Sequence, residues 1–178
     1  MRLKLREYKM QNKKYRIDYT QKIEEFGRTL YRIVALADFG SVTTGDQGGY
    51  IESEKNLSQS GNAWVYDNAK VYGNARVYGN AKVYGNARVY DNAKVYDNAI
   101  VYGNAEVTKL CITVRTRKYY CTILDTHMVI GCKNYTFSEW KNFDDETISK
   151  MDSGASEWWT QWKPILFEIL KVENKIQV

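Results

Sequence analysis

The sequence contains few residues of the kinds that most metal and redox sites require. Histidine and proline each occur once, and cysteine occurs three times, among the 178 residues. With one histidine, His127, the chain cannot build a site that needs several imidazole ligands. The cysteines show no CxxC spacing, and their odd count favours reduced thiols over a disulfide framework. We therefore expect no metal and no cofactor, and we interpret Cys111, Cys121 and Cys132 as ordinary buried thiols.

Long apolar runs are absent as well. No stretch of about eighteen apolar residues occurs, so we expect no helix that spans a membrane. The first residues, MRLKLREYKMQNKKYR, carry charges throughout and lack the apolar segment of a signal peptide. These absences predict a cytoplasmic protein without a membrane partner.

Positive charge is concentrated at the start of the chain. The net charge of the whole chain is +5. Between residues 2 and 16 the basic residues face a single acid, Glu7. Such a segment is usually a solvated strand or a frayed terminus, and the alternative is contact with an anionic partner.

Tyrosine is abundant, with 15 residues, and many of the tyrosines belong to a six-residue repeat, Asn-Ala-x-Val-Tyr-Gly/Asp. A period of six fits neither a helix, with about 3.6 residues per turn, nor a coiled coil. It fits short strands separated by tight corners. The valines and alanines stay in phase throughout: Val65, Val71, Val77, Val83, Val89, Val95, Val101 and Val107, with Ala63, Ala69, Ala75, Ala81, Ala87, Ala93, Ala99 and Ala105.

Each repeat combines a strand with a corner. In x-Val-Tyr the valine points to one side and its two neighbours point to the other. Glycine, aspartate and asparagine form the corner because they tolerate positive φ most readily. Alanine follows the corner, where a small side chain fits inside. The repeat therefore predicts a parallel β-solenoid whose narrow interior is filled by valine and alanine.

These residues resemble a known pattern. Val-Tyr-Gly-Asn-Ala-Lys is similar to the hexapeptide of left-handed β-helices, in which a small residue follows an aliphatic one four positions later. The lead-in GDQGGYIESEKNLSQSGNAWVYDNA resembles the first coil of the YdcK-like β-solenoid proteins of bacteria and phages, which are often labelled transferases. The similarity covers roughly residues 27 to 111, and the tail resembles that of related phage and gut-bacterial proteins. It implies left-handed coiling, three hexapeptides per turn, and a bacterial cell or a phage-infected host as the location.

Three hexapeptides per turn place residues 18 apart in adjacent turns, about 4.8 Å from each other. Asparagine side chains then stack as hydrogen-bonded ladders at the corners. The outer faces carry rows of tyrosine beside lysine or arginine, and two of these faces provide our candidate partner-binding residues. They are Trp64, Tyr66, Lys82, Tyr84, Ile100 and Tyr102 on the most apolar face, which we prefer, and Arg76, Tyr78, Lys94 and Tyr96 on another.

The flanking segments predict covers for the two open ends of the solenoid. We divide the chain into an N-terminal β segment and cap (1–48), the solenoid (49–111) and C-terminal strands and helices (112–178), which together form one compact unit. KKYRIDY and TLYRIVAL are typical of strands. Ile51 and Leu57 fall in phase with the alanines, so the coil should begin near Gly49.

The C-terminal segment predicts two or three antiparallel strands in CITVRTRKYYCTILDTHMVIGC, followed by helices. Ser153 or Asp152 could cap the last helix, and Pro164 should kink or divide it. Its apolar stripe favours a helical cap over the last coil. Homo-oligomerisation through these helices is the alternative. The stripe consists of Trp158, Trp159, Trp162, Ile165, Leu166, Ile169 and Leu170.

No set of residues predicts catalysis. The acyltransferases that share this architecture use a histidine near the coils, whereas His127 follows the repeats. Asp144, Asp145 and Glu146 stand where a helix should begin, and acids favour that end of a helix. GSVTTGDQGG matches no phosphate-binding motif. We therefore predict no catalytic residues and a protein that is not an enzyme.

The rows of tyrosine and basic residues predict a rigid, non-catalytic protein-binding module. The phage-like resemblance implies one concrete form, an inhibitor of a host defence system such as a defence nuclease complex, as anti-CRISPR proteins are. Nucleic-acid binding is an alternative, although Asn62 to Lys109 holds six basic and four acidic residues, a net charge of only +2. Two further alternatives are a hexapeptide-repeat acyltransferase and a purely structural scaffold.

Overall fold

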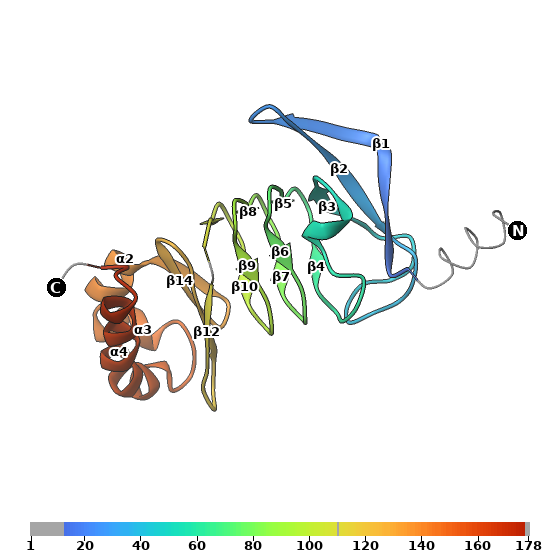
Figure 1. Ribbon diagram of the computed structural model, residues 1–178. Helices are drawn as coiled ribbons and strands as arrows, with labels where there is room; N and C mark the ends of the chain where they lie inside the picture. The colour runs from blue at the N-terminus through green and yellow to red at the C-terminus, as the bar shows by residue number, and fades with distance from the viewer. Residues whose placement is uncertain (1–12, 110, 177–178) are drawn as a thin grey trace, which may run out of the picture.

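The computed structural model describes residues 13–109 and 111–176. Most of the basic start that the sequence singles out lies outside these residues. The molecule is elongated, with an N-terminal hairpin at one end, a stack of coils in the middle, and a small sheet with helices at the other end (Figure 1). This arrangement is the capped, mainly β solenoid that the repeat predicts.

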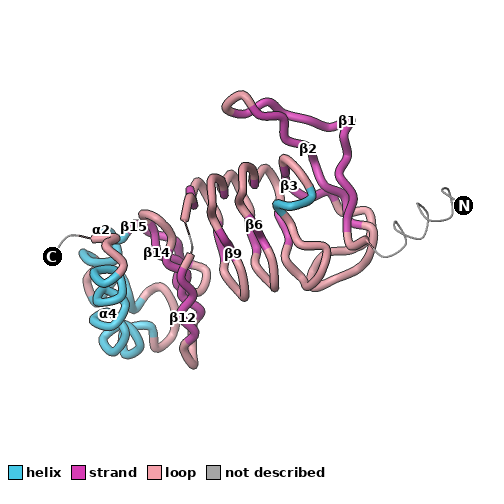
Figure 2. The backbone as a smooth tube through the Cα atoms, viewed as in Figure 1, coloured by secondary structure: helices cyan, strands magenta, loops and turns pink. Residues whose placement is uncertain are grey.

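The strands of the coils are two residues long, and each pairs in parallel with the strand one turn away. Trp64, Lys82 and Ile100 lie in register on one sheet, as do Lys70, Arg88 and Glu106 on another. Residues 18 apart therefore stack, and the successive coils lie side by side along the molecule (Figure 2). The strands of the coils fall into three sheets, one on each side of the coil. The strands are β4 (Trp64–Val65), β5 (Lys70–Val71), β6 (Arg76–Val77), β7 (Lys82–Val83), β8 (Arg88–Val89), β9 (Lys94–Val95), β10 (Ile100–Val101) and β11 (Glu106–Val107).

The interior and the corners follow the repeat. Every alanine and valine of the repeat is buried. Asp91 and Asp97 have φ of 56° and 54°, close to the φ of 65° and 71° at Gly73 and Gly79, which lie one turn earlier in the same corners. The two residue types therefore serve the same turn. The predicted asparagine ladders are present, with amide-to-carbonyl distances of 3.1 Å for Asn62–Asn80, 3.3 Å for Asn74–Asn92, 3.3 Å for Asn80–Asn98 and 3.4 Å for Asn86–Asn104.

The first coil begins with β3 (Gln47–Ile51), as expected, but its phase differs from our prediction. Ile51 pairs with Val71 and Leu57 with Val77, so both occupy valine places rather than alanine places. The reason is a corner after Leu57 that is two residues longer than the other corners. The Gln59 side chain in this corner pairs with the backbone of Tyr15, at 3.3 Å to its nitrogen and 3.2 Å to its oxygen.

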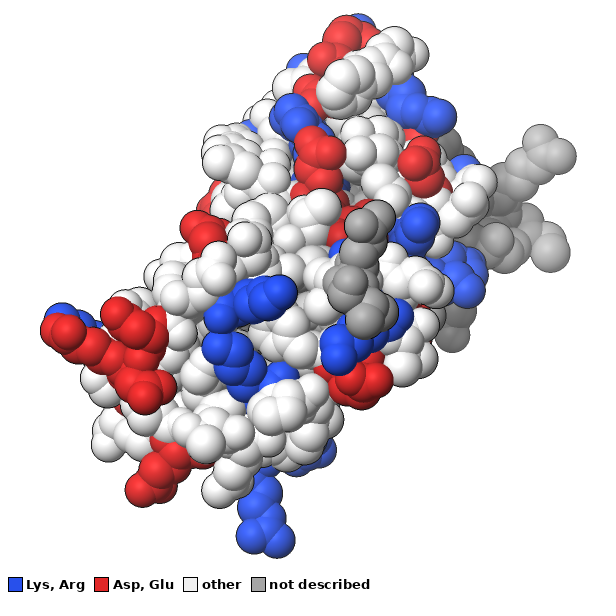
Figure 3. Space-filling model, turned by 90° about the vertical axis from the view of Figure 1, so that its left-hand side faces the viewer, with Lys and Arg blue, Asp and Glu red and all other residues white. Residues whose placement is uncertain are grey.

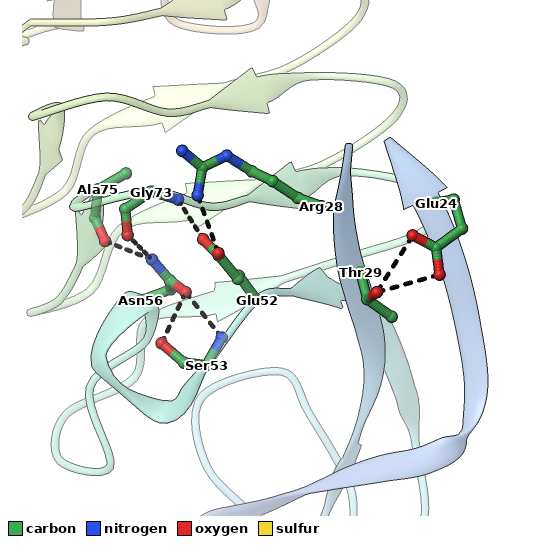
Figure 4. A network of polar contacts seen from close by, with 8 residues as sticks. All are labelled: Glu24, Arg28, Thr29, Glu52, Ser53, Asn56, Gly73 and Ala75. Atoms are coloured by element: carbon green, nitrogen blue, oxygen red, sulfur yellow. Dashed lines mark hydrogen bonds and ion pairs between the residues drawn. The ribbon is translucent and has the colours of Figure 1, made fainter. Parts of the chain in front are cut away.

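A buried asparagine closes this first coil (Figure 4). This residue, Asn56, is the last one of the short 3-10 helix η1 (Glu54–Asn56). The Asn56 amide donates to the carbonyls of Gly73 (3.1 Å) and Ala75 (2.9 Å), and its oxygen accepts from the Ser53 nitrogen at 2.9 Å. The side chain thus supplies the bonds that a neighbouring strand provides in later coils.

The N-terminal cap is a hairpin of β1 (Tyr15–Glu25) and β2 (Arg28–Ala35), which extends the sheet of β3, β5, β8 and β11. Tyr15 and Phe39 pack edge-on against Trp64, with ring centroids at 6.0 and 5.3 Å. Lys14 is buried beside them and donates to the Ala63 carbonyl at 2.8 Å. The cap and the first coil therefore share one core.

The C-terminal cap consists of an antiparallel sheet with helices on its outer side. Leu124 and Val129 pack with the coil interior, whereas Met128 and Ile130 pack with the helices. The sheet, rather than the last helix, covers the last coil. Its elements are β12 (Ile112–Arg115), β13 (Tyr120–Ile123), β14 (His127–Ile130), β15 (Lys133–Thr136), α2 (Phe137–Asn142), α3 (Asp145–Ser149) and α4 (Ala155–Val172).

The predicted cap of α4 was wrong, and of the two outcomes predicted for Pro164, a kink or a division, the division does not occur. Its N-cap is Gly154, with φ of 67° and no side-chain cap, while the Asp152 carboxylate accepts from the Tyr119 hydroxyl at 2.6 Å. Pro164 lies inside the continuous helix and does not divide it. Asp144, by contrast, caps α3 as expected, accepting from the Thr147 nitrogen at 2.8 Å.

Candidate binding faces of the solenoid

The solenoid presents three outer faces. Face A is formed by β4, β7 and β10, face B by β3, β5, β8 and β11, and face C by β6 and β9. The stacking places the predicted partner-binding residues on faces A and C, as the spacing requires.

Face A is covered at both ends. Trp64 is 1% exposed beneath the N-terminal cap, so it is not a partner contact, contrary to our prediction. The sequence could not show this burial because the covering rings, Tyr15 and Phe39, lie at least 25 residues away. At the other end the Tyr102 hydroxyl donates to the Cys132 carbonyl at 2.6 Å, and Ile100 is half-buried.

What remains open on face A is a shallow recess around Lys82. The Tyr84 ring stacks on Tyr102 with centroids 5.2 Å apart and meets Tyr66 edge-on at 6.3 Å. The recess has a volume of about 350 Å³ and also includes Asp67, whose carboxylate accepts from the Gly85 nitrogen at 3.0 Å. Face A, our preferred contact surface, thus offers one exposed cation between two caps.

Face B is closed by ion pairs. The Glu25 carboxylate, at the end of β1, lies 3.4 Å from Lys70 Nζ and 3.1 Å from Arg88 Nε. Arg88 also pairs with Glu106 at 2.9 Å. Tyr72 lies beneath and is 5% exposed, and burial raises its pKa to about 12. The basic residues of this face are therefore neutralised within the molecule.

Face C is the open face. Arg76 and Lys94 are both exposed, and neither side chain forms an ion pair or hydrogen bond with the residues that the structure describes. Tyr78 is 37% exposed and stacks on Tyr96, with ring centroids 5.4 Å apart and an interplanar angle of 11°. The stack holds both rings in one orientation.

A groove runs from face C to the first coil. It has a volume of about 410 Å³ and is lined by Arg76, Tyr78 and Lys94 together with residues of η1 and the long corner after it. Glu54, on this rim, is paired with Lys13. Lys55, also on the rim, is exposed. The groove therefore combines a rigid aromatic surface with unpaired positive charge.

Among the residues that the structure describes, the remaining titratable side chains form no recognisable catalytic site. His127 lies on β14, where its Nδ1 is 2.8 Å from the Thr126 hydroxyl. Within the described part of the chain, no group of three or more His, Cys, Asp or Glu residues could hold a metal ion. No described helix is long and apolar enough to cross a membrane.

The cysteines differ from each other. Cys111 and Cys121 are buried, as predicted, and burial raises their thiol pKa values to about 11 and about 12. Cys132 is exposed, contrary to our prediction, because it lies in the turn between β14 and β15. Its thiol is therefore the accessible one of the three.

Comparison with known proteins identifies the repeat. Residues 69–83 and 81–94 match the family described as the YdcK β-solenoid repeat. A curated protein of Escherichia coli (strain K12), named "Uncharacterized acetyltransferase YdcK", is 33% identical over 63 residues, which is 35% of this chain and 19% of that protein. The repeats within residues 69–94 are thus similar to those of the YdcK β-solenoid. The chain spans about a fifth of the length of that relative.

Proposed function

We propose that this protein is a non-catalytic binding module whose face C docks on an acidic surface of a partner protein. The observation that carries the proposal is that exposed Arg76 and Lys94, which form no ion pair with described residues, share one face with the stacked rings of Tyr78 and Tyr96. Tyrosine supplies large contact area with a polar tip at little cost in conformational entropy. Unpaired cations beside it attract and orient an acidic partner.

The rigidity of the solenoid supports this role. Each coil is fixed by parallel backbone hydrogen bonds to the next, for example from Arg76 N to the Ala93 carbonyl at 2.9 Å and from Tyr78 N to the Val95 carbonyl at 3.0 Å. A preformed surface loses little entropy on binding, which favours affinity. Face C therefore needs no rearrangement to present its side chains.

A protein partner fits this surface better than a nucleic acid does. Single strands require a continuous positive track together with bases stacked on open aromatic faces. The Tyr78 and Tyr96 rings stack on each other instead, and acidic Glu54 lies on the groove rim. The resemblance to phage proteins gives the proposal its concrete form, in which the partner belongs to a host defence system, such as a defence nuclease complex.

A pull-down with matched charge reversals tests the proposal. Tagged wild type and the variants Arg76→Glu/Lys94→Glu and Lys82→Glu are incubated with nuclease-treated lysate of the source organism and analysed by quantitative mass spectrometry. We expect the wild type and Lys82→Glu to retain the same protein in near-equal amounts and the face C variant to lose it. Retention of that protein by the face C variant contradicts the proposal. A parallel pull-down from untreated lysate that recovers nucleic acid alone contradicts it as well.

Acyl transfer is a second candidate, favoured by the name of the E. coli relative. It predicts binding of acetyl-CoA and an assembly in which subunits share a site. Calorimetric titration with acetyl-CoA, together with the mass of the protein in solution, tests it, with His127→Ala as the control. Binding that requires His127 would favour this candidate over the protein-binding module.

A further inference from the structure

The tyrosine row of face C is one ring shorter than the tyrosine row of face A. Face A carries rings in three successive turns, at Tyr66, Tyr84 and Tyr102. On face C the described structure stacks two rings, Tyr78 and Tyr96. The two faces therefore differ in the residue that stands at the start of the row, in the first coil.

Ser58 occupies the tyrosine place of the first coil on face C. Its nitrogen donates to the Val77 carbonyl at 2.9 Å, just as the Tyr78 nitrogen donates to the Val95 carbonyl one turn later at 3.0 Å. The Ser58 hydroxyl lies 3.1 Å from the hydroxyl of Ser60, within the long corner. A small side chain therefore stands where the other turns of this face carry a ring.

The corresponding place on face B is filled. Glu52 stands there, with its nitrogen donating to the Val71 carbonyl at 3.1 Å. Its carboxylate accepts from Arg28 at 2.9 Å, which holds the side chain over the surface. On face C the place instead opens into the groove of about 410 Å³, which both Ser58 and Tyr78 line.

The Tyr78 ring thus has one occupied side and one free side along the axis of the solenoid. Tyr96 stacks on the occupied side, with centroids 5.4 Å apart and 11° between the ring planes. The opposite side lies toward Ser58 and the groove, and Tyr78 is 37% exposed. Because aromatic rings associate by stacked or edge-on contacts, a ring bound in the groove is placed to continue the stack.

The charged groups of the groove favour acids beside that ring. Arg76, Lys94 and Lys55 are exposed at the groove, and none of them forms an ion pair with a described residue. Glu54, an acid in the lining, is paired with Lys13. The charge left unbalanced in the described lining is positive. On the side of the molecule that Figure 3 presents, basic and acidic areas are interspersed, so attraction of an acidic segment depends on the groups at the groove itself.

We propose that the groove takes an aromatic side chain of the partner protein, stacked on the free side of Tyr78, with neighbouring acids of the partner pairing with Arg76 and Lys94. This inference rests on the proposed function, since the ring and the acids belong to the partner of face C. It adds one requirement, which is that an acidic segment without a ring binds more weakly. One free side admits one ring, whereas a nucleic-acid strand stacks successive bases.

Titration with two blocked tripeptides, followed by heteronuclear NMR of the protein, tests the inference. Acetyl-Glu-Phe-Glu-amide provides a ring between two acids, and acetyl-Glu-Leu-Glu-amide keeps the acids without the ring. We expect the phenylalanine peptide to shift the backbone signals of Ser58 and Tyr78. It should bind about fivefold more tightly than the leucine peptide, which is the factor that an aromatic pair contributes beyond the burial of area.

Two variants of Ser58 provide the matched comparison. In Ser58→Tyr the chain completes its own stack, so the variant should bind both peptides equally weakly. Ser58→Ala removes the same hydroxyl, with its contact to Ser60, but leaves the place open, and it should keep the preference of the wild type. If Ser58→Tyr does not fold, the difference between the two peptides on the wild type decides the matter.

The results that overturn the inference differ from those that contradict the proposed function. Equal affinity of the wild type for both peptides, an undiminished preference in Ser58→Tyr, or the absence of shifts at millimolar peptide overturns the inference. If Arg76→Glu/Lys94→Glu loses both peptides while the ring makes no difference, the acidic docking surface stands and the aromatic site does not. Unchanged binding of both peptides by that variant contradicts the proposed function, and the inference with it.

Discussion

Glu25 and Arg88 lie 63 residues apart in the sequence, yet the Glu25 carboxylate accepts a hydrogen bond from Arg88 Nε at 3.1 Å. The contact ties the tip of the β1–β2 hairpin to β8, the third strand of face B, and Figure 1 shows the hairpin reaching over these coils. At the tip, Phe26 remains 76% exposed. One carboxylate thereby closes a face whose composition resembles that of the open face C.

Replacing Glu25 by Gln should release the hairpin tip without unfolding the protein. The ion pairs to Lys70 and Arg88 are partly exposed, so their loss should cost less than about 1 kcal/mol of the free energy of unfolding. Amide hydrogen exchange in the tip should nevertheless become faster. Mass spectrometry of hairpin peptides measures this change. Glu24→Gln is the control, because the polar contacts of the Glu24 carboxylate with described residues are to Thr29 and to exposed Lys22, both within the hairpin. Equal exchange rates in both variants would show that Glu25 does not hold the hairpin tip against face B.

Asn56 should be among the most sensitive polar residues of the fold. Asn56→Ala leaves the carbonyls of Gly73 and Ala75 without their donor inside the first coil, and we expect a loss of about 2–4 kcal/mol. Asn74→Ala, which removes an exposed ladder asparagine, should cost less than about 1 kcal/mol. Urea denaturation of the two variants measures both values. A smaller loss for Asn56→Ala than for Asn74→Ala would show that the side-chain bridge is dispensable.

The corner aspartates should be replaceable by glycine but not by a β-branched residue. Asp91 has φ of 56°, a conformation that glycine adopts freely and valine does not. We expect Asp91→Gly to change the free energy of unfolding by less than about 1 kcal/mol and Asp91→Val to reduce it by about 2 kcal/mol. Thermal and urea unfolding of the pair provide the measurement. Equal stability of the two variants would show that positive φ is not required at this corner.

The buried Lys14 should make stability depend on pH. Burial lowers its pKa to about 8 from 10.5, so between these values the unfolded chain binds more protons than the folded one. The contribution of this residue to stability therefore rises with pH across that window. The free energy of unfolding of wild type minus that of Lys14→Met should increase from about pH 8 to about pH 10. The buried thiols titrate in both wild type and Lys14→Met, so their contribution to the pH dependence cancels in the difference. A flat or falling difference contradicts the buried position of Lys14.

The repetitive part of this fold was predictable because the residues within each repeat determine its local structure. Alternation sends valine inward, alanine fits beside it, and glycine or aspartate forms the corner, so the faces and the asparagine ladders follow from spacing alone. Face C was predictable for the same reason, since Arg76, Tyr78, Lys94 and Tyr96 stack without help from outside the coils.

Where segments distant in the sequence meet, the predictions were incomplete or wrong. Trp64 has the periodicity of an exposed residue, but Tyr15 and Phe39 cover it. Ile51 keeps a six-residue phase with the alanines, but the longer corner that holds Tyr15 shifts it to a valine place. The closure of face B depends on Glu25, which no repeat contains. Periodicity carries no information about such contacts.

The most direct test of the central claim is site-specific photo-crosslinking from the faces of the folded solenoid. A photoreactive phenylalanine derivative replaces Tyr78 on face C, Tyr84 on face A or Tyr90 on face B, and adducts formed in cells of the source organism are identified by mass spectrometry. We expect position 78 to crosslink to one partner protein and positions 84 and 90 not to. Crosslinking from position 84 or 90 to that protein, with none from position 78, would contradict the proposed role of face C.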